Sequence, residues 1–136
     1  MSKLPRPESS CHISFYLKTV AVFLWTAGLV YLSLTPNGAG LAISGYDKVL
    51  HFAAYTLMSW LAAHSLRAIS FSIKSSAIIS IVYSIILGSL VELLQAALTE
   101  TRSAELGDII ANTIGALLGC AIFCLQEKLK SRRNER

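Results

Sequence analysis

Apolar residues form four long runs along the chain, and short polar stretches separate them. The runs cover about residues 15–34, 49–66, 76–98 and 106–125. Each is close to the roughly 20 residues that a helix needs to cross the hydrocarbon core of a bilayer. The pattern therefore predicts an all-α fold, an integral membrane bundle of four transmembrane helices.

Turn-forming and polar residues stand between these runs. Residues 35–40 read Thr-Pro-Asn-Gly-Ala-Gly, which is a turn signal after the first helix. Residues 67–75 link the second and third helices, and residues 99–103 form a polar hairpin before the fourth. Ser44 precedes Asp47 by three positions, and this spacing predicts a capping box that opens the second helix.

Composition supports a membrane location, and the distribution of charge predicts the orientation of the chain in the membrane. The 136 residues are 54% apolar and 15% charged, which is too apolar for a soluble domain of this size. Ten of the twelve Lys and Arg residues belong to the chain ends, to Lys18 or to the 67–75 linker, and only Lys48 and Arg102 lie on the other side. Since basic residues stay on the cytoplasmic side, both termini are predicted to be cytoplasmic. These tails form no folded basic surface, so no nucleic-acid partner is expected.

Three regions follow from the hydrophobic and charge patterns. We predict a cytoplasmic N-terminal tail over residues 1–14, a transmembrane domain over 15–125, and a basic cytoplasmic C-terminal tail over 126–136. Contact of the basic residues with anionic membrane lipids is expected at the cytoplasmic surface. Cys120 and Cys124 share one face of the fourth helix and are interpreted as packing residues.

Most polar and ionisable residues of the apolar domain gather at one end of the predicted bundle. The second helix begins there, the third ends there, and the fourth begins there, so residues far apart in sequence fall at one depth. We take these residues as a candidate polar site: Asp47, Lys48, His51, Glu92, Gln95, Arg102, Asp108 and Asn112.

Helical spacing places these residues on single faces. Positions three or four apart share a face of a helix, and this spacing gives three stripes. The second and third of them mix polar and small residues, as closely packed membrane helices do. The stripes are Asp47, His51 and Tyr55; Ser84, Gly88, Glu92, Gln95 and Thr99; and Asp108, Asn112, Gly115 and Gly119. We expect the G-x-x-x-G pair of the last stripe to serve packing within one molecule.

Glu92 is the residue of this set that is hardest to explain by structure alone. It lies about six residues, or roughly 9 Å, inside the third helix. A carboxylate at such a depth is costly, and residues of this kind usually form a pair or carry a function. We give equal weight to two explanations of Glu92. One is a structural pair with Arg102, Lys48 or His51, and the other is a functional role. Asp108 has a simpler alternative, because it complements the dipole in the first turn of its helix.

The ordered set of residues resembles the VanZ-like family over about residues 15–125. The positions that carry the resemblance are Asp47, Lys48, His51, Phe52, Glu92, Gln95, Arg102, Asp108, Asn112, Gly115 and Gly119. That family is named for a protein linked to low-level resistance to teicoplanin, a glycopeptide that targets cell-wall precursors. The resemblance implies a multi-pass protein of the bacterial cytoplasmic membrane with a role in the cell envelope, and it implies no particular reaction.

Three classes of function fit these residues. The first is a protein that binds or modulates a lipid-linked or cell-wall component, with Lys48, Arg102 and the start of the fourth helix holding a phosphate or carboxylate. Glu92, Gln95 and Asn112 would then hydrogen-bond the rest of the ligand. This class fits the resistance phenotype of the family's namesake.

The other two classes use the same residues differently. In a membrane-embedded enzyme, His51 with Glu92 or Asp108 would supply a general base and its orienting partner for a lipid-linked substrate. In a passive scaffold, the polar residues would only hold the helices together. A transporter is disfavoured because polar residues do not continue toward the cytoplasmic side. One histidine among carboxylates is a weak metal signature, so no metal and no cofactor are predicted.

Overall fold

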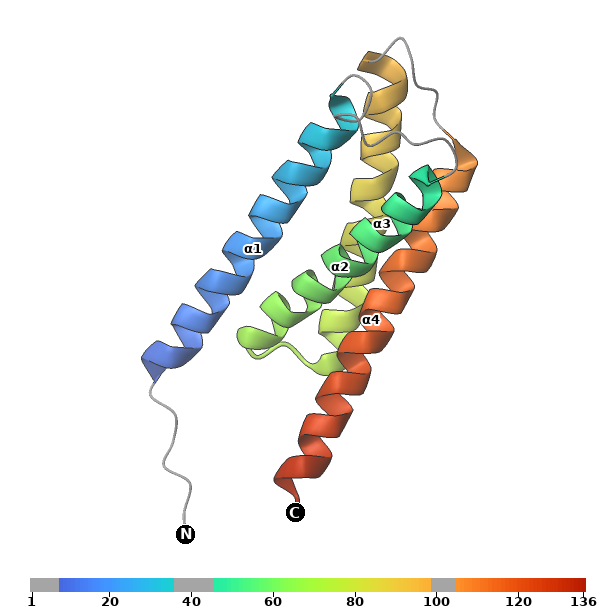
Figure 1. The fold of residues 1–136 in the computed structure, drawn as a ribbon. Coiled ribbons are helices and arrows are strands. Elements are labelled where there is room, and N and C mark those ends of the chain that lie inside the picture. Colours follow the sequence, from blue (N-terminus) through green and yellow to red (C-terminus); the bar gives the residue numbers. More distant parts are fainter. Residues whose placement is uncertain (1–7, 36–45, 99–104) are drawn as a thin grey trace.

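The computed structural model describes residues 8–35, 46–98 and 105–136, and this part of the chain forms four helices without a strand (Figure 1). The helices are α1 (Glu8–Leu34), α2 (Asp47–Ala68), α3 (Ile73–Leu98) and α4 (Leu106–Asn134). The predicted all-α bundle is confirmed.

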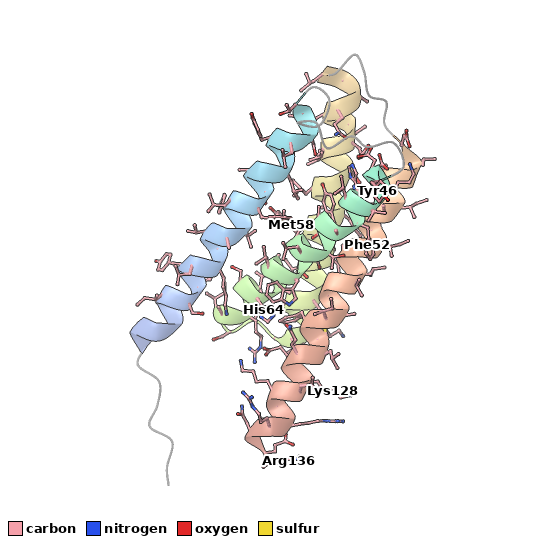
Figure 2. All side chains as sticks on the ribbon, in the orientation of Figure 1. Tyr46, Phe52, Met58, His64, Lys128 and Arg136 are labelled. Atoms are coloured by element: carbon pink, nitrogen blue, oxygen red, sulfur yellow. The ribbon has the colours of Figure 1, made fainter. Side chains whose placement is uncertain are left out.

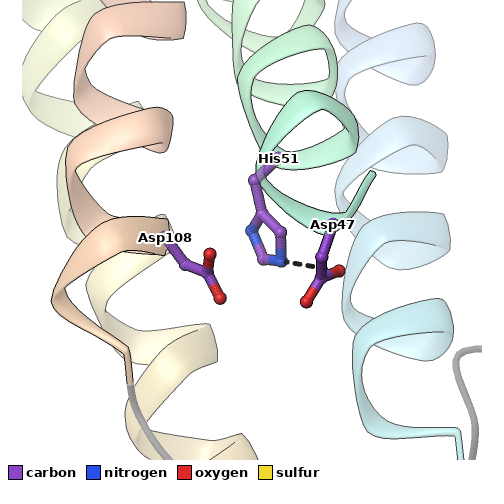
Figure 3. Close-up of side chains that lie close together, drawn as sticks. All are labelled: Asp47, His51 and Asp108. Atoms are coloured by element: carbon purple, nitrogen blue, oxygen red, sulfur yellow. Dashed lines mark ion pairs between the residues drawn. The ribbon is translucent and has the colours of Figure 1, made fainter. Parts of the chain in front are cut away.

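The helix ends differ from the apolar runs in three places. α1 begins at Glu8, ahead of the apolar run, and α4 continues to Asn134 through most of the basic C-terminal region. Tyr46 is the N-cap of α2, and no side chain caps the helix there. Ser44 lies outside the described residues, so the predicted capping box stays a prediction. The carboxylate of Asp47 lies 3.8 Å from the imidazole of His51, one turn along the same helix (Figure 3).

The four helices alternate in direction. Figure 1 shows the start of α1 and the end of α4 at the same end of the bundle. The end of α1, the start of α2, the end of α3 and the start of α4 lie at the other end. The termini of the helical part thus share one side, as the charge distribution requires, and the polar helix ends share the opposite side.

α2 and α4 make the closest contact in the bundle, and two glycines allow it. A Cβ at Gly115 would collide with the backbone carbonyl of Phe52, and a Cβ at Gly119 would collide with that of Thr56. The two helix backbones therefore touch directly along this face. This confirms that the G-x-x-x-G pair packs within the molecule, where small residues let membrane helices approach closely.

α1 is the peripheral helix. Over residues 13–35, whose side chains are described, none is buried. Hydrogen bonds attach α1 to its neighbours: Trp25 Nε1 donates to the carbonyl of Ala54 in α2 at 3.1 Å, and the hydroxyls of Thr26 and Tyr83 in α3 lie 2.9 Å apart. Trp25 therefore joins two helices instead of marking an interface with lipid head groups.

Three helices are long and apolar enough to cross a membrane: α1 over Ile13–Leu34, α3 and α4. Their outward faces carry many exposed large apolar side chains, which suits contact with lipid. α2 is not among the three, because polar residues occupy both of its ends. The chain is thus a membrane protein of apolar helices, while the number of crossings and the cytoplasmic position of the termini stay predictions.

Candidate functional site

Polar side chains of three helices meet where α2 begins, α3 ends and α4 begins. We call this group the His51 cluster; it consists of Asp47, Lys48, His51, Glu92, Glu105, Asp108 and Asn112. The group contains four carboxylates and one ammonium group, and two of the carboxylates contact that ammonium group. Six of the seven residues belong to the predicted polar site, and the fold brings them together.

His51 is buried and lies in the middle of the group. Its Nδ1 is 3.1 Å from Asn112 Oδ1 and 3.6 Å from Glu92 Oε1. Its Nε2 is 3.8 Å from Asp47 Oδ1, one helical turn earlier on α2. Figure 3 shows the imidazole between the carboxyl groups of Asp47 and Asp108. The two ring nitrogens therefore have different neighbours, an amide and Glu92 on one side and Asp47 on the other.

Three buried polar atoms of the cluster find no hydrogen-bond partner among the described residues. They are Glu92 Oε1, Asp108 Oδ1 and Asn112 Nδ2, and their residues are only 1%, 5% and 2% exposed. A buried polar atom without a partner costs about 1–3 kcal/mol, and more when it is charged. The cluster thus keeps hydrogen-bonding and ligating capacity that the surrounding side chains do not use.

Lys48 is the one cation among these described side chains, and carboxylates already surround it. Its Nζ is 2.8 Å from Glu105 Oε2 and 3.5 Å from Asp108 Oδ1. Gly107 makes room for the lysine stem, because a Cβ there would press on Lys48 Cε. The ammonium lowers the pKa of Glu105 below its usual range through the hydrogen bond and the charge. A phosphate at this lysine would have to compete with two carboxylates.

The helices place the buried members by simple register. Glu105 is the N-cap of α4, and its carbonyl accepts the N–H of Asp108 at 3.0 Å, so that carboxylate lies in the first turn. Asn112 follows one turn later on the same face. Gly88 on α3 leaves space for it, because a Cβ there would come within 3.0 Å of Asn112 Nδ2.

Two residues of the predicted site are not assigned to this group, for different reasons. Gln95 is buried, and its Nε2 donates to the carbonyl of Ser33 at 2.9 Å, which links α3 to α1. Arg102 lies outside the described residues. Glu105 is the member that the sequence analysis missed. Its only sequence signal is an acidic residue directly before the fourth apolar run, and its partner Lys48 is distant in the chain.

A second polar group lies at the opposite end of α2 and was not predicted. We call it the Glu127 cluster; it consists of Trp60, His64, Arg67, Gln126, Glu127 and Lys130. The Trp60 Nε1 and His64 Nε2 atoms lie 2.8 and 2.9 Å from Gln126 Oε1. Arg67 Nε lies 3.1 Å from Glu127 Oε2. Figure 2 shows His64 far along α2 from Tyr46, which marks the other end.

Buried serines lie on the inner faces of α2 and α3. Ser59, Ser76, Ser80 and Ser84 are fully buried. The expectation that polar residues do not continue along the bundle is therefore wrong. The spacing of four residues between Ser76, Ser80 and Ser84 already indicated in the sequence that these serines share one face of α3. The hydroxyls do not form a continuous hydrogen-bonded route, because Ser76 Oγ and Ser84 Oγ have no partner among the described residues.

Comparison with known families supports the interpretation of the fold. The model of the VanZ/LLP1 family matches residues 7–127, which is most of the chain and includes the whole His51 cluster. Comparisons with curated proteins and with solved structures gave no match. Since the family model covers well over half of the sequence, the chain belongs to the VanZ/LLP1 family.

Proposed function

We propose that this protein binds the polar head group of a lipid-linked or cell-wall component in the His51 cluster and thereby modulates glycopeptide susceptibility of the cell envelope. The observation that carries the proposal is the set of buried, unpartnered atoms of Glu92, Asp108 and Asn112 at one end of the bundle. Membership of the VanZ/LLP1 family supports it, since VanZ gives the family its link to teicoplanin. The proposal places the protein in the bacterial cytoplasmic membrane with the His51 cluster facing outward.

The geometry favours particular groups of the ligand. The His51 cluster has four carboxylates and, among the described residues, one lysine, which two of these carboxylates already contact. It therefore suits hydrogen-bond donors and cationic groups better than an isolated phosphate. Sugar hydroxyls, peptide amides and amines of a lipid-linked cell-wall precursor provide such donors. Glu92 Oε1 and Asp108 Oδ1 would accept them, and Asn112 Nδ2 would donate to a carbonyl of the same ligand.

Glu92→Gln tests the proposal. The change keeps size and shape and alters a carboxylate whose Oε1 has no hydrogen bond in the described structure, so the protein should fold and insert normally. We expect teicoplanin susceptibility of cells carrying the variant to equal that of the deletion strain. Thermal unfolding in detergent should give a midpoint within a few degrees of the wild type.

Ser84→Ala is the matched control for this substitution. It removes another buried, unpartnered oxygen from the same face of α3, two helical turns away from Glu92. Its susceptibility should equal that of the wild type. A stable Glu92→Gln protein with wild-type susceptibility would refute the proposed role of the cluster. A Glu92→Gln protein that unfolds would identify Glu92 as structural, and His51→Asn would then decide whether the cluster acts on susceptibility.

A second candidate function has support from one distance. His51 Nδ1 lies 3.6 Å from Glu92 Oε1, an arrangement that suits a general base oriented by a carboxylate. Such an enzyme would convert a lipid-linked substrate, whereas a binding protein leaves its composition unchanged. Mass spectrometry of lipid-linked precursors from wild-type, deletion and Glu92→Gln strains separates the two. A precursor that accumulates in both altered strains would favour the enzyme, and unchanged precursors would favour the binding protein.

A further inference from the structure

Three side chains of the His51 cluster have the donor set and spacing of a metal site. One carboxylate oxygen of Asp47, one imidazole nitrogen of His51 and one carboxylate oxygen of Asp108 all lie within 4.8 Å of one another (Figure 3). Ligand atoms about 2.1 Å from a tetrahedral ion are roughly 3.4 Å apart. Closing the difference requires a side-chain movement of about 1 Å. The side chain of Asp47 is 43% exposed in the first turn of α2, so packing confines it less than the buried side chain of Asp108.

The hydrogen bonding of His51 independently supports this arrangement. Metal-binding histidines usually donate the N–H of the other ring nitrogen to a carbonyl or carboxylate, which fixes the tautomer. His51 Nδ1 faces such acceptors, Asn112 Oδ1 at 3.1 Å and Glu92 Oε1 at 3.6 Å. With the proton on Nδ1, the lone pair of Nε2 points toward the Asp47 carboxylate at 3.8 Å. A lone pair and a carboxylate repel each other, and a cation between them turns this repulsion into attraction.

A further observation points to a missing partner. Asp108 is 5% exposed, and its Oδ1 has no hydrogen-bond partner among the described residues. Among the described residues the cation beside Asp108 is Lys48, at 3.5 Å, and its ammonium has a shorter contact of 2.8 Å with Glu105. The lysine can therefore stay on Glu105 while Asp108 binds another cation.

We propose that Asp47, His51 and Asp108 bind one divalent first-row metal ion, with Glu92 and Asn112 orienting the imidazole from its other side. An imidazole nitrogen with two carboxylates suits Zn²⁺ or Mn²⁺, whereas Mg²⁺ prefers a shell of oxygen atoms and water. The composition argument against a metal considered only the number of histidines. The fold changes that conclusion because it brings carboxylates of two helices to one imidazole.

The test uses the full-length protein, purified without a histidine tag, stripped with a chelator and placed in nanodiscs of uncharged lipid. Equilibrium dialysis against Zn²⁺, Mn²⁺ and Mg²⁺ with elemental analysis should give one bound Zn²⁺ or Mn²⁺ per chain and at least tenfold weaker Mg²⁺ binding. Bound metal should also raise the thermal midpoint, because it binds the folded state. Less than a fifth of an equivalent of Zn²⁺ and of Mn²⁺ on the wild type would overturn the proposal.

Variants locate the ion. His51→Gln and Asp108→Asn should weaken binding at least tenfold, and Asp47→Asn, at a partly exposed position that tolerates the change, should do the same if either of the others fails to fold. His64→Gln is the matched control, since it removes the other described histidine of α2 and should leave affinity unchanged. Lys48→Met should increase affinity, because it removes the competing ammonium beside Asp108. Equal affinity of the wild type and Asp47→Asn would overturn the assignment of ligands.

The visible spectrum of bound Co²⁺ adds a readout of the ligands themselves. Its bands should shift in His51→Gln and stay unchanged in His64→Gln. These measurements are made on purified protein and do not depend on glycopeptide susceptibility, so the metal site and the proposed function can fail separately.

Discussion

Each end of α2 places a histidine in a polar cluster that contains at least one carboxylate, but the charges of the two clusters are matched differently. In the Glu127 cluster a buried carboxylate faces Arg67 at 3.1 Å and Lys130 at 3.7 Å, and one amide oxygen lies within 3 Å of both Trp60 Nε1 and His64 Nε2. In the His51 cluster the one described lysine contacts two of the four carboxylates, and three buried atoms have no hydrogen-bond partner in the described part of the chain.

This difference suggests that the Glu127 cluster stabilises helix packing, whereas the His51 cluster can bind a ligand. In the Glu127 cluster a buried carboxylate is paired with a partly exposed arginine, and this pair links α4 to α2. Unmatched buried atoms cost stability, and an ordinary core would replace them with apolar side chains. Their presence in only one of the two clusters is the reason to place ligand binding at that end.

The largest expected effect comes from separating α2 and α4, which disrupts both clusters at once. Gly119→Leu inserts a side chain where even a Cβ would collide with the backbone at Thr56. The loss should exceed the about 1–3 kcal/mol typical of overpacking, because the obstacle is a helix backbone and not a movable side chain. Gly28→Leu is the control, since nothing lies within 4 Å of a Cβ there. Unfolding in detergent measures both, and similar midpoints would contradict the close contact.

An intermediate effect is expected when the Glu127 cluster loses its main cation. Arg67→Met leaves Glu127, which is 9% exposed, with the more distant Lys130 as its remaining cation among the described residues. We expect a loss of about 1–3 kcal/mol, less than for a fully buried pair because the arginine side chain is 39% exposed. Adding Glu127→Leu to this variant should restore most of the lost stability, because it removes the unpaired buried carboxylate. A double variant no more stable than Arg67→Met would show that the pair is not what fastens the helices.

The smallest effect concerns the exposed pair at the edge of the His51 cluster. Lys48 lowers the pKa of Glu105 below 4.5 in the folded protein. The pair therefore stabilises the fold above about pH 4.5, and this contribution is lost as the pH falls through the lowered pKa of the folded state. Carboxyl NMR titration in micelles should show this low pKa, and Lys48→Met should return it toward 4.5. An unchanged value in Lys48→Met would show that the lysine is not its cause.

The amino-acid sequence by itself determined the class of fold and the depth of the polar residues. Apolar runs long enough to cross a bilayer leave helices as the structure that satisfies every backbone group in lipid. The stripes that repeat every three or four residues gave the inner faces correctly: His51, Glu92 and Asn112 are all buried. The glycine pair also gave a correct contact, because close approach of membrane helices needs small residues.

Only the tertiary structure decided which charges meet. Lys48 and Glu105 are more than fifty residues apart in the sequence and form an ion pair between the N-terminal ends of α2 and α4. No local sequence pattern therefore indicates the pair. The same holds for Arg67 and Glu127, whose cluster the sequence analysis missed. Periodicity specifies the face of a helix on which a residue lies, but the partner depends on how the helices pack, and an ion pair forms only within a few ångströms. For that reason only the fold distinguishes the Glu127 cluster, whose charged groups are paired, from the His51 cluster, which has buried polar atoms without a hydrogen-bond partner among the described residues.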